Sequence, residues 1–250
     1  MGIMKKLDVY ISGETMDLCI PTLEFAKESQ WYSWFNKPRL TRYLEQGLFP
    51  ETPEAQEEFF RSQGKDRLIF IISNKSDYMG VVSLSHINLI KKTCEIATVI
   101  DSSVDKLQSP YIALEAIARI TKHAFEVLGI NRIFAGQHKE LVGWRQRMEL
   151  LGYVVEGIHA DKFNKGRETA DGITLACVYS TYKRIVKQRG ALWDSREKFK
   201  IRYKSSLKNS TKNDLKWWGD VLSRKYINGV NKNFKVKVYQ NHFYQRDLIF

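Results

Sequence analysis

Long apolar runs, cysteine and proline are all scarce in this chain, and each scarcity excludes a class of protein. No stretch approaches the roughly 18 consecutive apolar residues that a membrane-spanning helix needs. Only 5 prolines and 15 glycines occur among 250 residues, which excludes a collagen-like fibre. The first eight residues contain no apolar segment of the kind that a signal peptide requires, so we expect none.

The three cysteines, Cys19, Cys94 and Cys177, lie far apart in apolar surroundings and lack the spacing of metal ligands. A disulfide mini-protein is therefore excluded, and we expect no metal. Buried, reduced thiols of this kind are typical of a cytoplasmic protein. The remaining composition, 43% hydrophobic and 27% charged, is that of a folded globular protein rather than a disordered chain.

The net charge of +12 is distributed unevenly along the chain. Residues 191–250 carry 14 lysines and arginines against 5 acidic residues, whereas the preceding 190 residues carry 26 against 23. The sequence therefore predicts a nearly neutral domain, residues 1–188, and a small basic, aromatic-rich extension, residues 189–250. The basic charge of the extension suits a polyanionic partner.

Strand and helix patterns alternate through the first domain, with strands predicted by apolar alternation and helices by apolar residues at helical spacing and by caps. Strands are expected at 7–12, 15–20, 67–73, 79–90, 93–100, 130–136, 153–157 and 173–180, and helices at 23–35, 53–61, 109–128 and 141–151. A polar loop is expected between the last two strands. In the extension, we expect helices at 183–204 and 214–226 and a strand at 234–239.

Eight short segments stand in an order and spacing typical of one family. They are Gly13–Leu18, Trp31–Asn36, Thr41–Leu44, Phe49–Glu54, Met79–Val82, Ala113–Ala116, Ala124–Ile133 and Glu149–Tyr153. Together, over residues 7–183, the chain resembles the GNAT superfamily of acyl-CoA-dependent N-acetyltransferases. It is most similar to the branch that contains ribosomal-protein N-terminal acetyltransferases and nucleotide-amino-sugar acetyltransferases. The resemblance implies an α/β (α+β) fold whose mixed, mostly antiparallel central sheet is flanked by helices.

The predicted cofactor site lies at the start of the helix expected from residue 109. A helix N-terminus has unpaired N–H groups and a positive dipole end, which suit a pyrophosphate. The resemblance implies that the chain binds acetyl-CoA here as its cosubstrate and assigns the contacts by residue: Val99, Ile100, Gln108, Ser109, Tyr111, Ile112, Ala113 and His138. Tyr111 stands where the family has glycine, and Pro110 lacks an N–H.

Three residues are candidates for the proton transfers of the reaction. Glu95 stands in an apolar strand, at the position of the catalytic glutamate of some family members, and burial would raise its pKa. Asp101, at the end of that strand, and His86, on the neighbouring strand, are further candidates for the base. The alternatives are an ion-paired strand glutamate, a turn-forming aspartate and a structural histidine. Met148 occupies the position of the family's usual tyrosine acid, so no acid is assigned.

The amine acceptor is expected beside Trp31, Trp34 and Asn36, because the first helices cover the acceptor cleft in the family. The alternative is that the two tryptophans, at helical spacing, belong to the core. A charged acceptor, such as a nucleotide diphosphate, could also contact the predicted polar loop, which otherwise faces solvent. The charged residues of this loop are Asp161, Lys162, Lys165, Arg167 and Asp171.

The resemblance implies an N-acetyltransferase that transfers an acetyl group from acetyl-CoA to a primary amine by direct attack in a ternary complex. A nucleotide-linked amino sugar is the favoured acceptor. One alternative is a protein amine, as in part of the resembled branch, or an amine on nucleic acid, because lysines and arginines alternate with aromatic residues in the extension. Another is a non-catalytic binding protein with the same fold.

Overall fold

The computed structural model describes residues 6–74, 77–101, 104 and 109–209. The chain divides after Tyr203 into two compact units, and nearly all of the described residues belong to the first unit. Gln108, the helix expected at 214–226 and the strand expected at 234–239 lie outside the described residues. The boundary expected after residue 188 stays a prediction.

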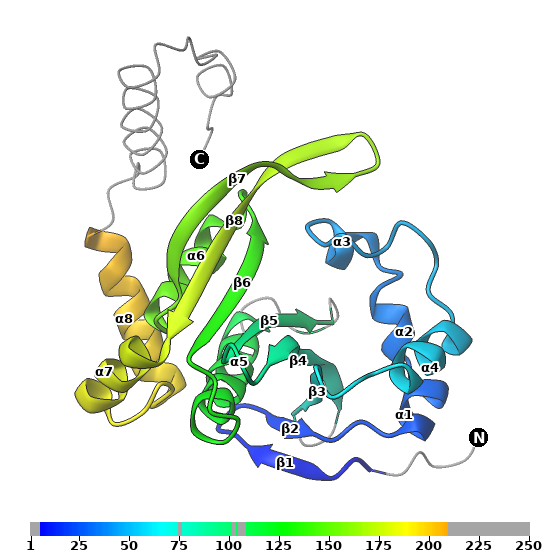
Figure 1. Cartoon of the computed structure of the whole chain (residues 1–250), viewed down its shortest axis with the longest axis horizontal. Helices are drawn as coiled ribbons and strands as arrows, with labels where there is room; N and C mark the ends of the chain where they lie inside the picture. Colours follow the sequence, from blue (N-terminus) through cyan, green and yellow to red (C-terminus); the bar gives the residue numbers. More distant parts are fainter. Residues whose placement is uncertain (1–5, 75–76, 102–103, 105–108, 210–250) are drawn as a thin grey trace. The chain divides into compact units, whose positions relative to one another are not determined.

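The described strands form one eight-stranded sheet in the order β1-β2-β3-β4-β5-β6-β8-β7 (Figure 1). Every neighbouring pair is antiparallel except β5 and β6. This mixed, mostly antiparallel sheet confirms the expected fold class. The strands are β1 (Val9–Ser12), β2 (Asp17–Cys19), β3 (Leu68–Ser73), β4 (Tyr78–Asn88), β5 (Thr93–Ile100), β6 (Arg132–His138), β7 (Val154–Lys165) and β8 (Glu168–Val178).

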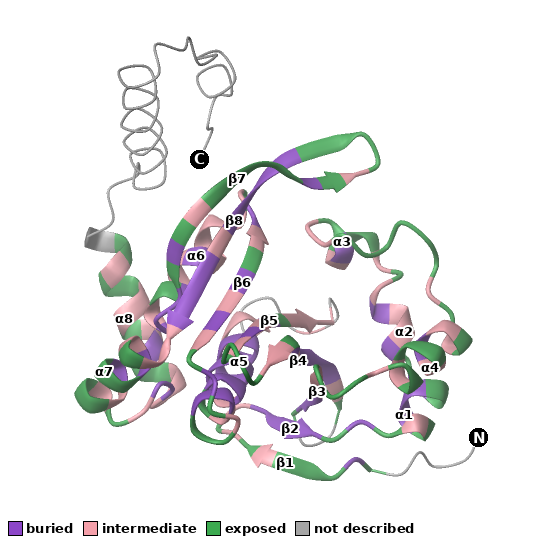
Figure 2. Ribbon diagram, in the orientation of Figure 1, coloured by how far each residue is buried: buried purple, intermediate pink, exposed green. Residues whose placement is uncertain are grey.

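The longest described helix, α5 (Ser109–Glu126), follows β5 and is buried along most of its length (Figure 2). Its alanine and isoleucine side chains recur at helical spacing, which places most of them in the core. The other described helices are α1 (Leu23–Glu28), α2 (Trp31–Trp34), α3 (Pro38–Thr41), α4 (Pro53–Arg61), α6 (Val142–Leu150), α7 (Tyr179–Arg189) and α8 (Arg196–Asn209).

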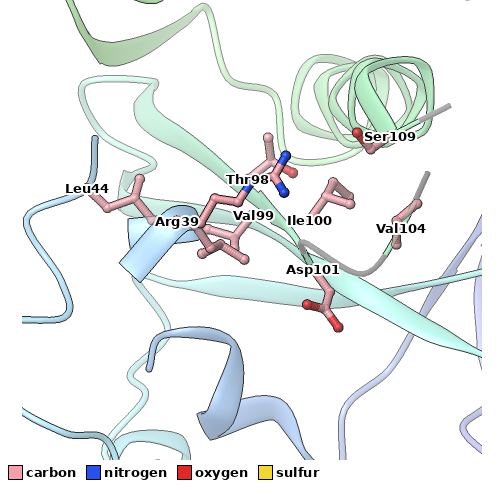
Figure 3. Close-up of a pocket in the computed structure, with 9 residues that line it drawn as sticks. Arg39, Leu44, Thr98, Val99, Ile100, Asp101, Val104 and Ser109 are labelled. Carbon is pink, nitrogen blue, oxygen red and sulfur yellow. The ribbon is translucent and has the colours of Figure 1, made fainter. Parts of the chain in front are cut away.

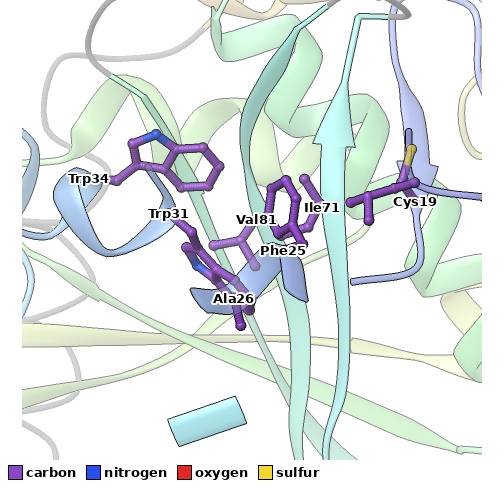
Figure 4. Close-up of a cluster of buried hydrophobic side chains, with 8 residues drawn as sticks. Cys19, Phe25, Ala26, Trp31, Trp34, Ile71 and Val81 are labelled. Carbon is purple, nitrogen blue, oxygen red and sulfur yellow. The ribbon is translucent and has the colours of Figure 1, made fainter. Parts of the chain in front are cut away.

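A cluster of buried side chains joins the first helices to the sheet (Figure 4). Phe25 of α1 and Trp31 of α2 pack in one cluster with Ile71 of β3 and Val81 of β4. Trp34 belongs to the same cluster and is 4% exposed. The first helices are thereby fixed over one face of the strands, so that they can form a wall of any site on that face.

β5 and β6 separate after a short parallel contact. Their pairing covers only Thr93–Glu95 against Arg132–Phe134, although β5 continues to Ile100 and β6 to His138. The two strands visibly diverge in Figure 1. The backbone of β5 beyond Glu95 is therefore not paired with β6, and this edge of the strand is available to a ligand.

Three expectations about the elements are wrong. The helix expected at 23–35 is divided into α1 and α2, because Ser29 is extended and its hydroxyl accepts a hydrogen bond from the Trp31 N–H at 3.2 Å. The polar loop expected before the last strand is instead the outer half of the β7–β8 hairpin, in which most side chains face solvent and the apolar alternation disappears. The helix expected at 183–204 is divided into α7 and α8 by Gly190, whose φ is 84°.

The segment after α7 packs against the first part of the chain. Trp193 and Phe199 are buried, and their rings stack with centroids 5.2 Å apart. The Glu14 carboxylate accepts hydrogen bonds from the Trp193 indole N–H and the Arg196 backbone N–H, both at 2.9 Å. These two aromatic residues of the predicted extension therefore belong to the core.

Candidate functional site

A first cavity of about 270 Å³ lies at the end of β5 (Figure 3). Thr98, Val99 and Ile100 of β5 form its floor, and the start of α5 reaches it at Ser109. Arg39 of α3 supplies the lining with a guanidinium group. The cavity therefore combines an open strand edge, a helix start and a cation, which suit an anionic ligand with an extended chain.

Asp101 lines the first cavity directly after β5. Its carboxylate is paired with the Lys37 ammonium group at 2.5 Å, and its N–H donates to the Met79 carbonyl oxygen at 2.7 Å. The structure thus places this predicted base at the cavity but in an ion pair. The Lys37 ammonium group therefore occupies one oxygen atom of this carboxylate.

A second cavity of about 310 Å³ lies on the face of the sheet that α2 and α4 cover. Its walls include Trp31, Phe35 and Phe59, and its polar side chains include Glu51, Gln56 and Arg67. Leu44, Thr98 and Val99 line both the first and the second cavity. The two cavities therefore meet across the end of β5.

Glu95 belongs to the same face of β5 as the second cavity. Val99 and Ala97 line that cavity, and side chains of a strand alternate between faces, so Glu95 continues their row. It stands one repeat beyond Ala97, about 7 Å along the strand. Cys94 and Ile96, the two neighbours of Glu95 along the strand, are buried, as expected for the other face. Glu95 is therefore at the rim of the second cavity.

His86 and Glu95, two predicted catalytic residues, are in contact. Their Nδ1 and Oε2 atoms are 3.2 Å apart. His86 has a φ of 51° and lies where the β4–β5 register shifts, between Ser85 and Asn88. The His86 side chain is 71% exposed. The pair is therefore open to solvent and to the rim of the second cavity.

The predicted acceptor residues have different surroundings. Trp31 is a core residue that also lines the second cavity, whereas Trp34 lies in the core. Asn36 holds the backbone of Glu51, donating through Nδ2 to its carbonyl oxygen and accepting from its N–H, both at 2.7 Å. Asn36 therefore fixes the chain next to a cavity residue.

A third cavity, of about 770 Å³, opens beside α3 and the outer end of the β7–β8 hairpin. Arg39 is shared with the first cavity and Phe35 with the second. Arg42, the exposed Phe49 and Lys165 also line it. Of the charged residues expected in a polar loop, Lys165 is the one in this lining. Asp161, Lys162 and Arg167 are exposed elsewhere on the hairpin, and Asp171 is buried beside Lys139.

At the start of α5, the Tyr111 side chain is directed toward α8. Its ring lies 6.3 Å from the Phe199 ring, and the Arg196 and Lys200 cations are 5.7 and 5.6 Å from its centroid. Ile112 and Ala113, which follow, are buried in the core. Tyr111 therefore does not line the first cavity, and these three residues could reach a ligand only through their backbone.

His138, at the end of β6, is buried between the rings of Tyr43 and Phe163, with centroids 4.8 and 4.7 Å away. Its Nδ1 accepts from the Glu140 N–H at 3.2 Å. Burial lowers the pKa of His138, so the imidazole is neutral at pH 7. His138 contributes to none of the three cavities described above.

Residues 18–154, more than half of the chain, match the family model of the acetyltransferase (GNAT) domain. The chain belongs to the GNAT acetyltransferases. This confirms the family expected from the sequence and the acyl-CoA-dependent acetyltransferase class of enzyme. No curated protein matches the sequence significantly.

Solved structures share the GNAT fold at low sequence identity. A putative acetyltransferase from T. thermophilus is 17% identical, covers 74% of this chain and 97% of its own, and has a TM-score of 0.58. Spermidine N-acetyltransferase from Vibrio cholerae, solved with CoA and spermine, is 18% identical, with coverages of 68% and 98% and a TM-score of 0.59. The microcin C7 self-immunity acetyltransferase MccE, solved with acetyl-CoA and AMP, is 20% identical, with coverages of 66% and 93% and a TM-score of 0.55.

GNAT enzymes take the acetyl group from acetyl-CoA, and the described residues fit this cosubstrate. The free edge of β5 beyond Glu95 can pair with an amide-containing chain, as a neighbouring strand would. The first cavity places the α5 N-terminus and Arg39 where phosphate groups would follow. Tyr111 leaves this space open.

The described part of the chain shows neither a metal-binding cluster nor a membrane-spanning helix. There, no three histidine, cysteine, aspartate or glutamate side chains gather as a metal ion would require. Nor does any described helix combine the length and apolar character needed to cross a membrane.

Three polar residues of the second cavity were not predicted from the sequence: Glu51, Gln56 and Arg67. Gln56 carried a signal, because it precedes Phe59 and Phe60 by three and four positions and so shares their helix face. A glutamine on the apolar face of a helix is a candidate for a polar contact. Glu51 and Arg67 lie outside helices and carried no comparable signal.

Proposed function

We propose that this GNAT enzyme transfers the acetyl group of acetyl-CoA to a primary amine by direct attack in a ternary complex, and that the amine belongs to a nucleotide-linked amino sugar. The observation that carries the proposal is the shared wall of Leu44, Thr98 and Val99. Two ligands, one in each cavity, would meet at this wall. Direct transfer between two bound substrates requires such an arrangement.

On the cosubstrate side, the backbone of Val99 and Ile100 holds the acyl chain along β5, and Ser109 and Arg39 hold the phosphate end. Acetyl-CoA supplies the activated acetyl group when it is bound. The chain's own residues orient it, exclude water and polarise the reacting carbonyl through backbone N–H groups.

On the amine side, Glu95 is the proton acceptor and His86 positions its carboxylate through their contact. The new C–N bond forms as the C–S bond breaks, the amine proton passes to Glu95 or to a water beside it, and the thiolate leaves. Glu51, in the cavity lining, attracts the incoming ammonium group. Asp101, ion-paired to Lys37, has its role on the cosubstrate side.

Support for a nucleotide-linked acceptor comes from the third cavity. Arg42, which does not line the first cavity, supplies a guanidinium group that suits phosphate oxygens, and the exposed Phe49 ring suits stacking on a base. Phe35 lines both the second and the third cavity. One ligand could therefore place its amino sugar in the second cavity and its nucleotide in the third.

Calorimetric titration with acetyl-CoA, compared with desulfo-CoA, tests the proposal first. We expect micromolar binding, followed by thiol release with nucleotide-linked amino sugars and little release with peptides. Absence of both heat and thermal stabilisation at millimolar acetyl-CoA would overturn the proposal. Preferential acetylation of peptides would overturn only the assignment of the acceptor.

A further inference from the structure

One residue of the second cavity has a buried amide nitrogen without a recorded hydrogen-bond partner. Gln56 of α4 is 4% exposed, and its Nε2 atom is buried without a hydrogen bond in the described structure. Gln56 also lines the cavity. Because buried polar groups are nearly always paired in folded proteins, an unpaired one at a cavity wall indicates a missing ligand atom.

The charges of this cavity limit what the ligand can be. Glu51 and Arg67 are the charged residues of its lining, so a carboxylate is balanced by a guanidinium group. Arg67 lies over the Phe59 ring, 5.6 Å from its centroid, and no described carboxylate forms an ion pair with it. A polyamine, with several ammonium groups and no oxygen, would leave both Gln56 and Arg67 without an acceptor and would be repelled by Arg67.

We propose that Gln56 is a specificity-determining residue that binds an oxygen atom of the amine acceptor. The acceptor is then a monoamine with hydroxyl or carbonyl oxygens near its amino group, and polyamines are excluded. A hydroxyl group suits either end of the Gln56 amide, because it both donates and accepts. The inference rests on the proposed function, since it takes the second cavity as the amine site.

The test measures amine binding to the full chain saturated with desulfo-CoA. D-Glucosamine and cyclohexylamine share a six-membered ring and one amino group, but only glucosamine carries oxygen. We expect glucosamine to bind at least tenfold more tightly than cyclohexylamine or spermidine, on the order of the discrimination expected from one buried hydrogen bond. Gln56→Met, which keeps the side-chain length, should reduce that preference to about threefold or less.

Two further variants control the experiment. Gln188→Met, at an exposed position on α7, should retain the full preference. Gln56→Glu adds a carboxylate to the cavity and should increase spermidine affinity, which a variant that merely loses its fold would not do.

The inference is overturned if wild-type protein binds the three amines equally, binds none of them, or if Gln56→Met retains the preference. Its failure is distinguishable from failure of the proposed function. Acetyl-CoA binding and thiol release are measured separately. If the enzyme turns over but Gln56→Met keeps the preference for glucosamine, this inference alone is removed.

Discussion

Lys165 holds Leu44 in place across 121 positions of the chain, with its Nζ atom 3.1 Å from the Leu44 carbonyl oxygen. The same ammonium group donates to the carbonyl oxygens of Thr41 and Gln46, both at 2.6 Å. Leu44 lines the first and second cavities, and Gln46 lines the second. The outer end of the β7–β8 hairpin therefore fixes a wall that both proposed substrates would touch.

Lys165→Met should loosen this wall without unfolding the protein. Three charge-assisted hydrogen bonds are lost, but Gln46 is exposed and Leu44 is half-buried, so water can bind their carbonyl oxygens in place of Lys165. We expect KM for the amine to rise about tenfold, with a shift in melting temperature of a few degrees at most. Steady-state kinetics and thermal denaturation check this.

Arg167→Met removes the same charge from the exposed turn of the hairpin, where the structure records no contact with residues 41–46. This control should leave KM unchanged. If both variants raise KM equally, the effect comes from charge and the positioning role of Lys165 is wrong.

The assignment of the base is tested by comparing Glu95→Gln with Asp101→Asn. Loss of a general base costs roughly 10²–10⁴ in kcat. We expect that loss for Glu95→Gln. Asp101→Asn should leave kcat nearly unchanged and lower KM for acetyl-CoA, because it removes a carboxylate from the first cavity and frees the Lys37 ammonium group for an anionic ligand. If instead Asp101→Asn lowers kcat by this factor and Glu95→Gln does not, Asp101 is the base.

The order of elements could be predicted from the sequence because strand alternation and helix caps are local signals. The helix expected at 53–61 is α4, whose start is marked by a threonine followed by proline, and the Thr52 hydroxyl accepts a hydrogen bond from the Ala55 N–H. The outer half of the β7–β8 hairpin was missed because most of its side chains are exposed, so polar residues replace the alternation on which a strand prediction depends.

The candidate site was only partly predictable. Glu95 and His86 were identified from strand position, but their contact depends on the backbone irregularity at His86, which leaves no mark on the residue pattern. Glu51 enters the second cavity through a long-range contact with Asn36. Such contacts are set by tertiary packing, and sequence spacing does not encode them.

The buried carboxylate of Glu115 predicts a large stability effect away from the cavities. It is fully buried in α5 and accepts hydrogen bonds from the Thr15 N–H and hydroxyl at 2.8 and 2.7 Å, and it pairs with Arg119 at 2.9 Å. Removing one partner of a buried ionic network costs about 3–5 kcal/mol. Glu115→Ala should therefore lower the free energy of unfolding in urea by that amount.

Glu58→Ala is the matched control, because Glu58 is an exposed helix residue of α4. Surface substitutions of this kind change stability by about 0.5 kcal/mol or less. Comparable losses in the two variants would mean that the Glu115 network contributes nothing beyond helix propensity.

The Asp194–Arg202 pair predicts how stability depends on pH. Arg202 donates from Nη1 to Asp194 Oδ2 at 2.9 Å, and this bonding lowers the pKa of Asp194 from 3.8 to about 2. Because the folded pKa is depressed, the stabilisation is complete above about pH 4 and is lost as the pH falls toward 2. The shift corresponds to about 2 kcal/mol, and the Asp194 side chain is only 10% exposed.

Asp194→Asn should therefore lower the free energy of unfolding by about 2 kcal/mol at pH 7, and the difference from wild type should shrink toward pH 2. Urea denaturation at pH 7, 5, 4 and 3 measures this dependence. Asp8→Asn, at an exposed aspartate, controls for the general loss of a carboxylate. A difference that stays constant over this range would mean that Asp194 contributes by packing and not by its charge. In that case, the segment joining α7 to α8 would be held by Trp193 and Phe199 rather than by the ion pair.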